Sequence, residues 1–163
     1  MIDAFNLAGF LSAHAIWCIE DGEVLIPIFG YMMANGERRL ERIELENHEV
    51  SVALGKRNLE ANQYGAINAV LLYDGRVQLG AEKIDAIIVE IRSYSQLYPE
   101  AVLFIPYRSK SSSVKFLVYR PKLVHWKNWD DLDLEAALES FFEGVDAHEH
   151  GAAVWNASLD QSL

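Results

Sequence analysis

The segment that most restricts the fold of this chain is KIDAIIVEIRSY, residues 83–94. Read as a β-strand, it is apolar on both faces, with Ile84, Ala86 and Ile88 on one face and Ile87, Val89 and Ile91 on the other. Successive side chains of a strand point to opposite faces, and a strand that is apolar on both must be covered on both. We therefore expect this segment in the interior of a sheet.

Turn signals divide the flanking sequence into further strands. Asp21-Gly22, Asn35-Gly36 and Asp74-Gly75 each separate two strand-like runs, and these residues suit the tight turns of hairpins. Pro27 has no N–H to donate, so its strand should be bulged or lie at an edge. The run 37–45 should be a largely solvated strand. AVLFIPY and VKFLVYR should pair across the loop RSKSSS.

Helical signals occur in three places. Apolar residues at helical spacing over residues 3–13 predict the first helix, and Asn47 is a suitable N-cap for a second that runs to about residue 62. Asp130 or Asp131 should cap a third helix. Its inner stripe should consist of Leu134, Leu138, Phe141 and Val145.

The resulting element order, α-βββ-α-βββββ-α, lacks the strict alternation of a parallel α/β fold. We expect an α+β single domain over residues 1–150. Its sheet should be antiparallel and meander-like, with about six to eight strands and three helices. Residues 151–163 should form a C-terminal tail that can be flexible. Within this tail, Trp155 is the aromatic side chain best suited to anchor on a neighbouring surface.

Composition restricts the class of protein. The chain has 163 residues, 51% of them hydrophobic, and a formal net charge of -10, so nucleic acid is an unlikely partner. The single cysteine, Cys18, has apolar neighbours and should be a buried thiol in a reducing compartment. Polar residues interrupt the apolar N-terminal segment, so we expect no membrane span and a cytoplasmic protein.

The sequence offers no motif for catalysis or for a cofactor, and we expect neither. Nucleophile-elbow, dinucleotide, P-loop and zinc-protease patterns are missing. Asp85 and Glu90 are five positions apart and would face opposite sides of a strand, so they make no simple dyad. Each should pair as an inward-facing residue with a nearby cation, or mark where the strand leaves the core. His148 and His150 could share a metal only if the segment were extended, and we expect no metal site there.

Charge is distributed in blocks along the chain. Residues 101–129 hold six Lys and Arg residues and no acid, whereas residues 130–163 hold nine Asp and Glu residues and no Lys or Arg. Two interpretations stay open. In the first, the acidic C-terminal helix or tail complements the basic hairpin (residues 107–122), within one subunit or across a dimer; in the second, the hairpin binds an external anion. The candidate binding residues are Arg108, Lys110, Lys115, Arg120, Lys122, His125, Trp126 and Trp129.

The function that fits these features is a cytoplasmic, non-catalytic protein-binding module, chaperone-like or a regulatory adaptor, that forms a homodimer and binds a protein partner. The alternative is an enzyme or small-ligand-binding domain with a pocket near His125, Trp126 and Trp129 and the basic hairpin. In HWKNW (residues 125–129) the aromatic residues could stack on a ligand, or they could simply seal the junction of a helix and the sheet.

Overall fold

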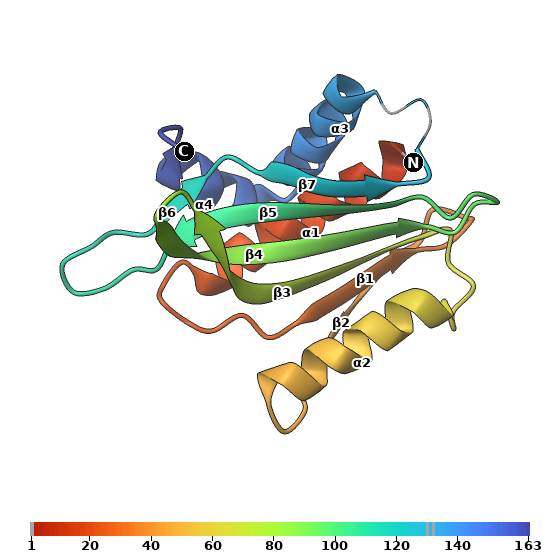
Figure 1. Cartoon of the computed structure of the whole chain (residues 1–163), viewed down its shortest axis with the longest axis horizontal. Helices are drawn as coiled ribbons and strands as arrows, with labels where there is room; N and C mark the ends of the chain where they lie inside the picture. The colour runs from red at the N-terminus through yellow and green to blue at the C-terminus, as the bar shows by residue number, and fades with distance from the viewer. Residues whose placement is uncertain (1, 130, 132) are drawn as a thin grey trace.

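A computed structural model describes residues 2–129, 131 and 133–163. The chain folds into four helices and eight strands arranged on one curled, mostly antiparallel sheet, an α+β fold (Figure 1). The elements are α1 (Ile2–Ile19), β1 (Ile28–Met32), β2 (Arg38–Arg42), α2 (His48–Ala61), β3 (Asn68–Leu79), β4 (Glu82–Ser93), β5 (Glu100–Arg108), β6 (Leu117–Tyr119), β7 (Lys122–Lys127), α3 (Leu134–Ala147), α4 (Glu149–Ser158) and β8 (Leu159–Asp160).

The sheet has the strand order β2-β1-β3-β4-β5-β6-β8, with β7 also paired to β5. The segment that is apolar on both faces is β4, which pairs with β3 on one side and β5 on the other, so its interior position is confirmed. The sheet is not a pure meander. β1 pairs with β3 although β2 and α2 lie between them in the sequence, and β6 and β7 both pair with the same edge of β5. It is also not purely antiparallel, because β6 and β8 run parallel.

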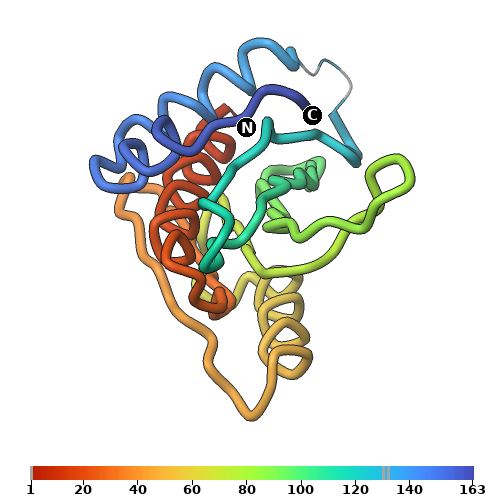
Figure 2. Tube along the Cα trace, turned by 90° about the vertical axis from the view of Figure 1, so that its left-hand side faces the viewer, coloured from red at the N-terminus to blue at the C-terminus, as the bar shows by residue number. Residues whose placement is uncertain are grey.

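Helices cover both faces of the sheet. α1 lies along one face, where its buried side chains join those of β3, β4 and β5 in the main core, and α3 and α4 pack behind it as an outer layer (Figure 2). α2 covers a second, smaller cluster on the opposite face, which includes Phe29, Leu59 and Leu71. The α1 helix is long and apolar enough to cross a membrane, but 61% of it is buried inside this fold. Burial accounts for its apolar character.

The first helix extends six residues beyond its expected C-terminal end at residue 13. Residues 15–19, which the sequence suggested as a strand, continue α1 because Ala15, Ile16 and Ile19 extend its buried stripe. Asp21-Gly22 therefore ends a helix and does not turn a hairpin: Gly22 has φ +90° and donates its N–H to the Ile19 carbonyl. Cys18 is exposed, so the expectation of a buried thiol is wrong.

The other two turn signals have different outcomes. Asn35-Gly36 does join β1 to the exposed strand β2, with Gly36 at φ +86°. Asp74-Gly75 lies inside the long strand β3, and the chain turns only at Gly80, which has φ +61°. The sequence-based assignment failed here because Gly75 is needed for space and not for a turn: a Cβ on it would press on the side chain of Ile88.

The C-terminal part has two helices where one was expected. Asn47 caps α2 as predicted, but the N-cap of α3 is Asp133, which accepts the Ala136 N–H at 3.0 Å. Asp130 lies outside the described residues. Residues 151–163, expected as a tail, contain most of α4 and all of β8, and Trp155 is only 2% exposed against α1 and α3. Burial of this indole explains why the segment is ordered.

Candidate functional site

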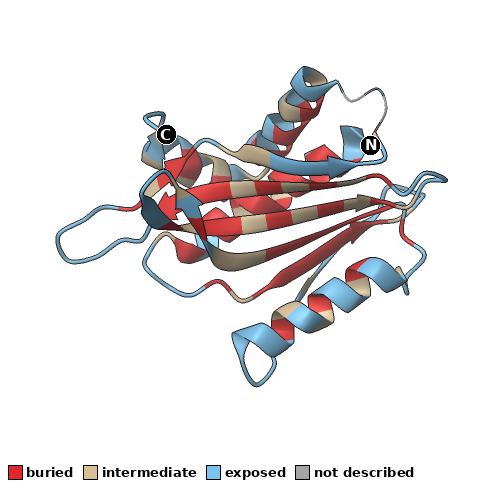
Figure 3. Cartoon of the chain, in the orientation of Figure 1, coloured by how far each residue is buried: buried red, intermediate tan, exposed pale blue. Residues whose placement is uncertain are grey.

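The cations of the basic hairpin are mostly engaged with the body of their own chain. Arg108 pairs with Glu82 at 3.2 Å and binds the Tyr119 hydroxyl, and Lys110 reaches Asp21 at 3.4 Å. Arg120 donates to the Leu163 carbonyl at 3.3 Å. Ion pairs to Lys115 and Lys122 do not occur among residues 2–129, 131 and 133–163. The hairpin projects beyond the sheet with its loop exposed (Figure 3).

A polar hollow of about 310 Å³ separates this hairpin from the β3–β4 turn. Its cations include Arg76, Lys83 and Arg108. Arg76 already pairs with Asp85 at 3.5 Å, and Arg108 with Glu82. Two of the three charges are thus neutralised by the protein itself, which weakens the case for an external anion at this place.

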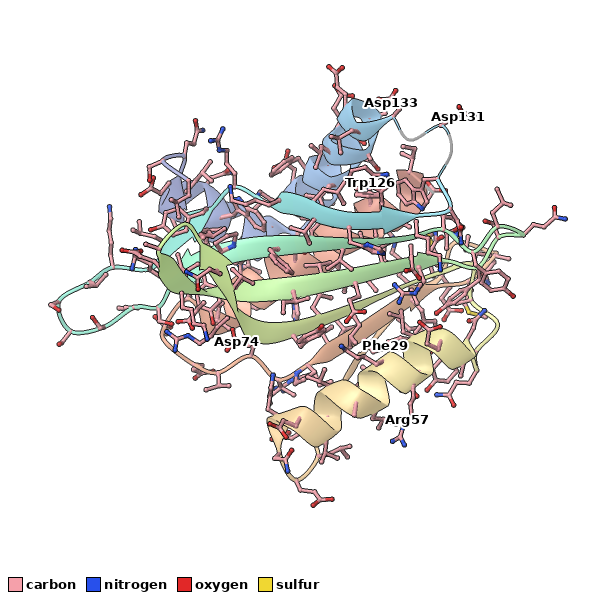
Figure 4. The ribbon with its side chains drawn as sticks, in the orientation of Figure 1. Phe29, Arg57, Asp74, Trp126, Asp131 and Asp133 are labelled. Atoms are coloured by element: carbon pink, nitrogen blue, oxygen red, sulfur yellow. The ribbon has the colours of Figure 1, made fainter. Side chains whose placement is uncertain are left out.

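The HWKNW segment does not gather into one pocket. His125 lies opposite Val102 on β5 and contacts Glu100 at 3.2 Å, on the face of the sheet away from α1. Trp126 is the next residue of β7 and points to the other face, toward the side from which α3 begins (Figure 4). Trp129 packs edge-on against Phe5 of α1, with ring centroids 5.1 Å apart. Trp129 and the adjacent Asn128 line a cavity of about 410 Å³.

A network of charged and polar groups crosses the sheet face that α1 leaves open, and the sequence indicated only part of it. Its members come from five elements: Lys56 and Glu60 of α2, Tyr73 of β3, Glu90 and Arg92 of β4, Glu100 of β5 and His125 of β7. Arg92 is central, at 3.0 Å from Glu60, 3.4 Å from Glu100 and 3.8 Å from Glu90. The expected pairing of Asp85 and Glu90 with cations is confirmed.

The environment of Glu90 suggests a structural role for this network. Tyr73 donates to Glu90 at 2.7 Å, and burial together with this hydrogen bond raises the pKa of the Tyr73 hydroxyl well above its usual value. A second buried hydroxyl, that of Tyr107, donates to Asp74 at 2.6 Å, and burial raises both pKa values. Every carboxylate in these contacts has a donor on the protein, so the groups hold α2, β3, β4 and β5 together.

The histidines of the DAHEHG segment do not converge on one point. His148 is the N-cap of α4 and accepts the Gly151 N–H through Nδ1 at 2.9 Å. His150 stacks on Trp17, with ring centroids 4.9 Å apart. No set of three or more metal-ligating side chains is found in the part of the chain that the structure describes. The absence of a bound metal stays a prediction for experiment.

The outer side of α3 carries acids and two partly accessible apolar side chains: Leu138 packs partly against the main core, and Phe142 lies edge-on to Trp155 with ring centroids 6.2 Å apart. Leu134, expected on the inner stripe, is exposed. Residues at positions 135, 138, 139, 142, 143 and 146 form one stripe along the helix and line a shallow hollow of about 690 Å³. The stripe consists of Glu135, Leu138, Glu139, Phe142, Glu143 and Asp146, and we call it the α3 stripe. Phe142 is 38% exposed, and Leu134 at the start of the helix is 44% exposed.

Comparisons with known proteins add no functional information. The chain matches no protein family, no curated protein and no solved structure.

Proposed function

We propose that this protein is a non-catalytic protein-binding module, chaperone-like or a regulatory adaptor, whose binding surface is the α3 stripe. The observation that supports it most directly is the composition of that stripe, in which the apolar pair Leu138 and Phe142 is flanked by four carboxylates. Its occupant is a cationic, amphipathic segment of a partner protein. Such a segment would lay an apolar side on Leu138 and Phe142 and its cations on the flanking acids.

Electrostatics narrows the class of partner. The sequence contains no Lys or Arg after residue 127, so the acids of the α3 stripe have no cation near them in the chain. No acid of the stripe forms an ion pair within the described part of the chain. A concentrated negative field attracts cationic segments and repels nucleic acid and anionic lipid. Phe142 would provide the aromatic anchor that typically dominates such interfaces.

A second copy of this chain is the competing occupant. The basic hairpin would have to supply the cations, but Arg108, Lys110 and Arg120 already bind groups of their own chain, which leaves Lys115 and Lys122 as the hairpin cations without an ion pair among the described residues. A partner protein therefore explains the α3 stripe better than a second copy does. The homodimer expected from the sequence stays a prediction, and a dimer built on this stripe would compete with the partner.

The proposal is tested with two designed peptides of one composition. In the first, Leu and Lys are placed at helical spacing so that the helix is amphipathic; in the second, the same residues are shuffled to remove the apolar side. Fluorescence anisotropy should show tighter binding of the amphipathic peptide, and Phe142→Ser should weaken it at least tenfold. The double variant Glu139→Lys with Glu143→Lys should weaken binding of the amphipathic peptide more at low salt than at high salt.

A matched control separates this surface from general acidity. Glu44→Lys with Glu46→Lys changes the net charge equally on exposed residues near β2 and should leave binding within twofold. Equal binding of both peptides, or equal loss in both charge-reversed variants, would contradict the proposal. Sedimentation of the free protein completes the test, because a dimer that Phe142→Ser dissociates would assign the stripe to a second copy instead.

A further inference from the structure

A cavity of about 320 Å³ lies between α1 and the loop that leads from it to β1, and the proposed function makes no use of it. Its polar lining consists of His14 and Cys18 of α1, Glu23 of the loop and Arg42 of β2. Its apolar lining consists of Val24, Leu25, Ile26 and Ile28. Small-molecule sites commonly combine an apolar wall of this kind with a few convergent polar groups, at volumes from about 300 Å³.

A relay of two hydrogen bonds determines which ring nitrogen of His14 carries the proton. The Gly151 N–H donates to Nδ1 of His148 at 2.9 Å, so the neutral His148 ring carries its proton on Nε2. That Nε2 lies 3.1 Å from Nδ1 of His14 and therefore donates to it. His14 must then carry its own proton on Nε2, the nitrogen that has no hydrogen-bond partner within residues 2–129, 131 and 133–163. The relay leaves His14 with a donor to offer.

The relay also argues against a metal ion between the two rings. A ligating imidazole normally donates its second N–H to a neighbouring acceptor. Nδ1 of His148 instead accepts a backbone N–H, so His148 could bind a metal through Nε2 only after breaking the cap of α4. The pair is consequently better suited to holding one tautomer than to holding an ion.

Arg42 adds a second donor to the lining. Its guanidinium makes no ion pair with any described residue, whereas that of Arg39, on the same strand, pairs with Glu37 at 2.9 Å. A guanidinium next to an imidazole N–H fits a carboxylate, which can accept from both. Leu25 and Ile28 are 2% and 1% exposed, so they belong to the packed core behind these donors.

We propose that this cavity binds a small apolar carboxylate, with its charged group on Arg42 and on the Nε2–H of His14 and its hydrocarbon body against the accessible side chains of Val24 and Ile26. His148 acts as a positioning residue, because it fixes the tautomer of His14 without lining the cavity. No covalent step is involved. Cys18 serves as a reporter only, since partial burial raises the pKa of its thiol and disfavours a nucleophilic role.

The chain contains one cysteine, and that cysteine lines the cavity, so occupancy can be read from thiol labelling. The rate of Cys18 alkylation by iodoacetamide, a neutral reagent, is measured at pH 7.5 with 4-methylpentanoate up to about 10 mM. We expect a saturable fall in rate. The isosteric 4-methylpentanamide should protect at least tenfold less well, because it lacks the charge that Arg42 recognises.

Variants then assign the contacts. Arg42→Met should weaken protection at least tenfold, whereas Arg39→Met removes the same charge from the same strand outside the cavity and should leave it unchanged. His148→Asn keeps an acceptor for the Gly151 N–H, but its shorter side chain should no longer bring a donor to Nδ1 of His14. It should weaken protection several-fold and change the His14 ring-nitrogen shifts in NMR. A merely structural role for His148 would not move those shifts.

Three results would overturn the proposal. The first is equal protection by the acid and the amide, and the second is full protection of the Arg42→Met variant. The third is protection by 4-methylpentylamine in place of the acid, which would assign the cavity to cations through Glu23. Unfolding curves of each variant show that it is folded, and Arg42→Lys, which keeps the charge, should retain partial protection.

Discussion

Gly9 of α1 lies directly against the backbone carbonyl of Phe141 in α3, with no side chain between the two helices. Two further glycines repeat this contact: Gly144 of α3 meets the carbonyl of Asn6, and Gly151 of α4 meets the carbonyl of Ala13. A Cβ at any of the three would overlap backbone atoms, which cannot rotate away. These glycines therefore bring the outer helices onto α1 and place both the α3 stripe and His148.

Gly144→Ala should destabilise the protein by about 2 kcal/mol or more, even though alanine is the better helix former by about 1 kcal/mol. The matched control is Gly55→Ala in α2, where the new Cβ would meet only side-chain atoms of Leu71 and Ile43, which can shift. We expect that variant within about 1 kcal/mol of the parent. Urea unfolding measures both, and equal stability of the two variants would show that the close helix contact is not rigid.

Arg92 should be the most sensitive charge in the protein. Its side chain is 14% exposed and lies within 4 Å of Glu60, Glu90 and Glu100, so Arg92→Met would remove the central cation from Glu90 and Glu100, whose side chains are only 12% and 26% exposed. We expect a loss of about 2–4 kcal/mol in the free energy of unfolding. Arg76→Met, which breaks the exposed pair with Asp85, should cost less than about 1 kcal/mol. Comparable losses would mean that burial does not govern these pairs.

Local patterns predicted the elements whose signals lie within a few residues. The interior strand β4, the Asn47 cap and the Asn35-Gly36 turn each follow from periodicity or from one side chain at one backbone position. The ends of α1 and β3 were misjudged, since Asp21-Gly22 and Asp74-Gly75 have the composition of hairpin turns. What they do in the fold depends on packing against distant residues.

The candidate sites depend on long-range contacts and were less accessible. His14 and His148 are 134 positions apart, and no spacing rule joins them. The sequence HWKNW suggested one aromatic cluster, but side chains alternate along β7, so His125 and Trp126 point to opposite faces of the sheet. One overlooked signal was present: Gly9 and Gly144 sit inside otherwise strong helical patterns, where an isolated glycine usually has a packing reason.

Stability should fall as the pH drops below about 6.5, because His14 and His148 resist protonation in the folded state. Burial lowers the pKa of both rings, and His148 and Arg42 lower that of His14 further. The unfolded chain takes up these protons near pH 6.5, so it is favoured between that pH and the lower folded pKa values. The two neutral rings therefore contribute their full stabilisation above pH 6.5, and this contribution is lost once the pH falls below their pKa values in the folded protein.

Urea unfolding between pH 7.5 and 4.5 measures this dependence. The double variant His14→Gln with His148→Asn should show a shallower decline, because it lacks the two rings whose pKa values folding lowers. The other titratable groups facing the pair, His150, Glu23 and Cys18, are present in both proteins and cancel in the comparison. Identical slopes would show that the two rings titrate freely in the folded protein.

Charge reversals distinguish pairing inside the subunit from pairing between copies. Lys110 and Asp21 lie 3.4 Å apart, so Lys110→Glu and Asp21→Lys should couple by about 0.2–1 kcal/mol in a double-mutant cycle. Lys115 has no ion pair among the described residues, and Glu139 lies on the α3 stripe. Lys115→Glu and Glu139→Lys should therefore add within about 0.5 kcal/mol.

Salt and protein concentration identify the origin of any coupling. The Lys110–Asp21 coupling should shrink in 1 M salt, where screening acts over roughly 3 Å, and should not depend on protein concentration, because both residues belong to one chain. If Lys115 and Glu139 couple instead, and do so more strongly as concentration rises, the basic hairpin of one copy lies on the α3 stripe of another. That result would replace the cationic partner by a second copy and restore the homodimer as the main use of this surface.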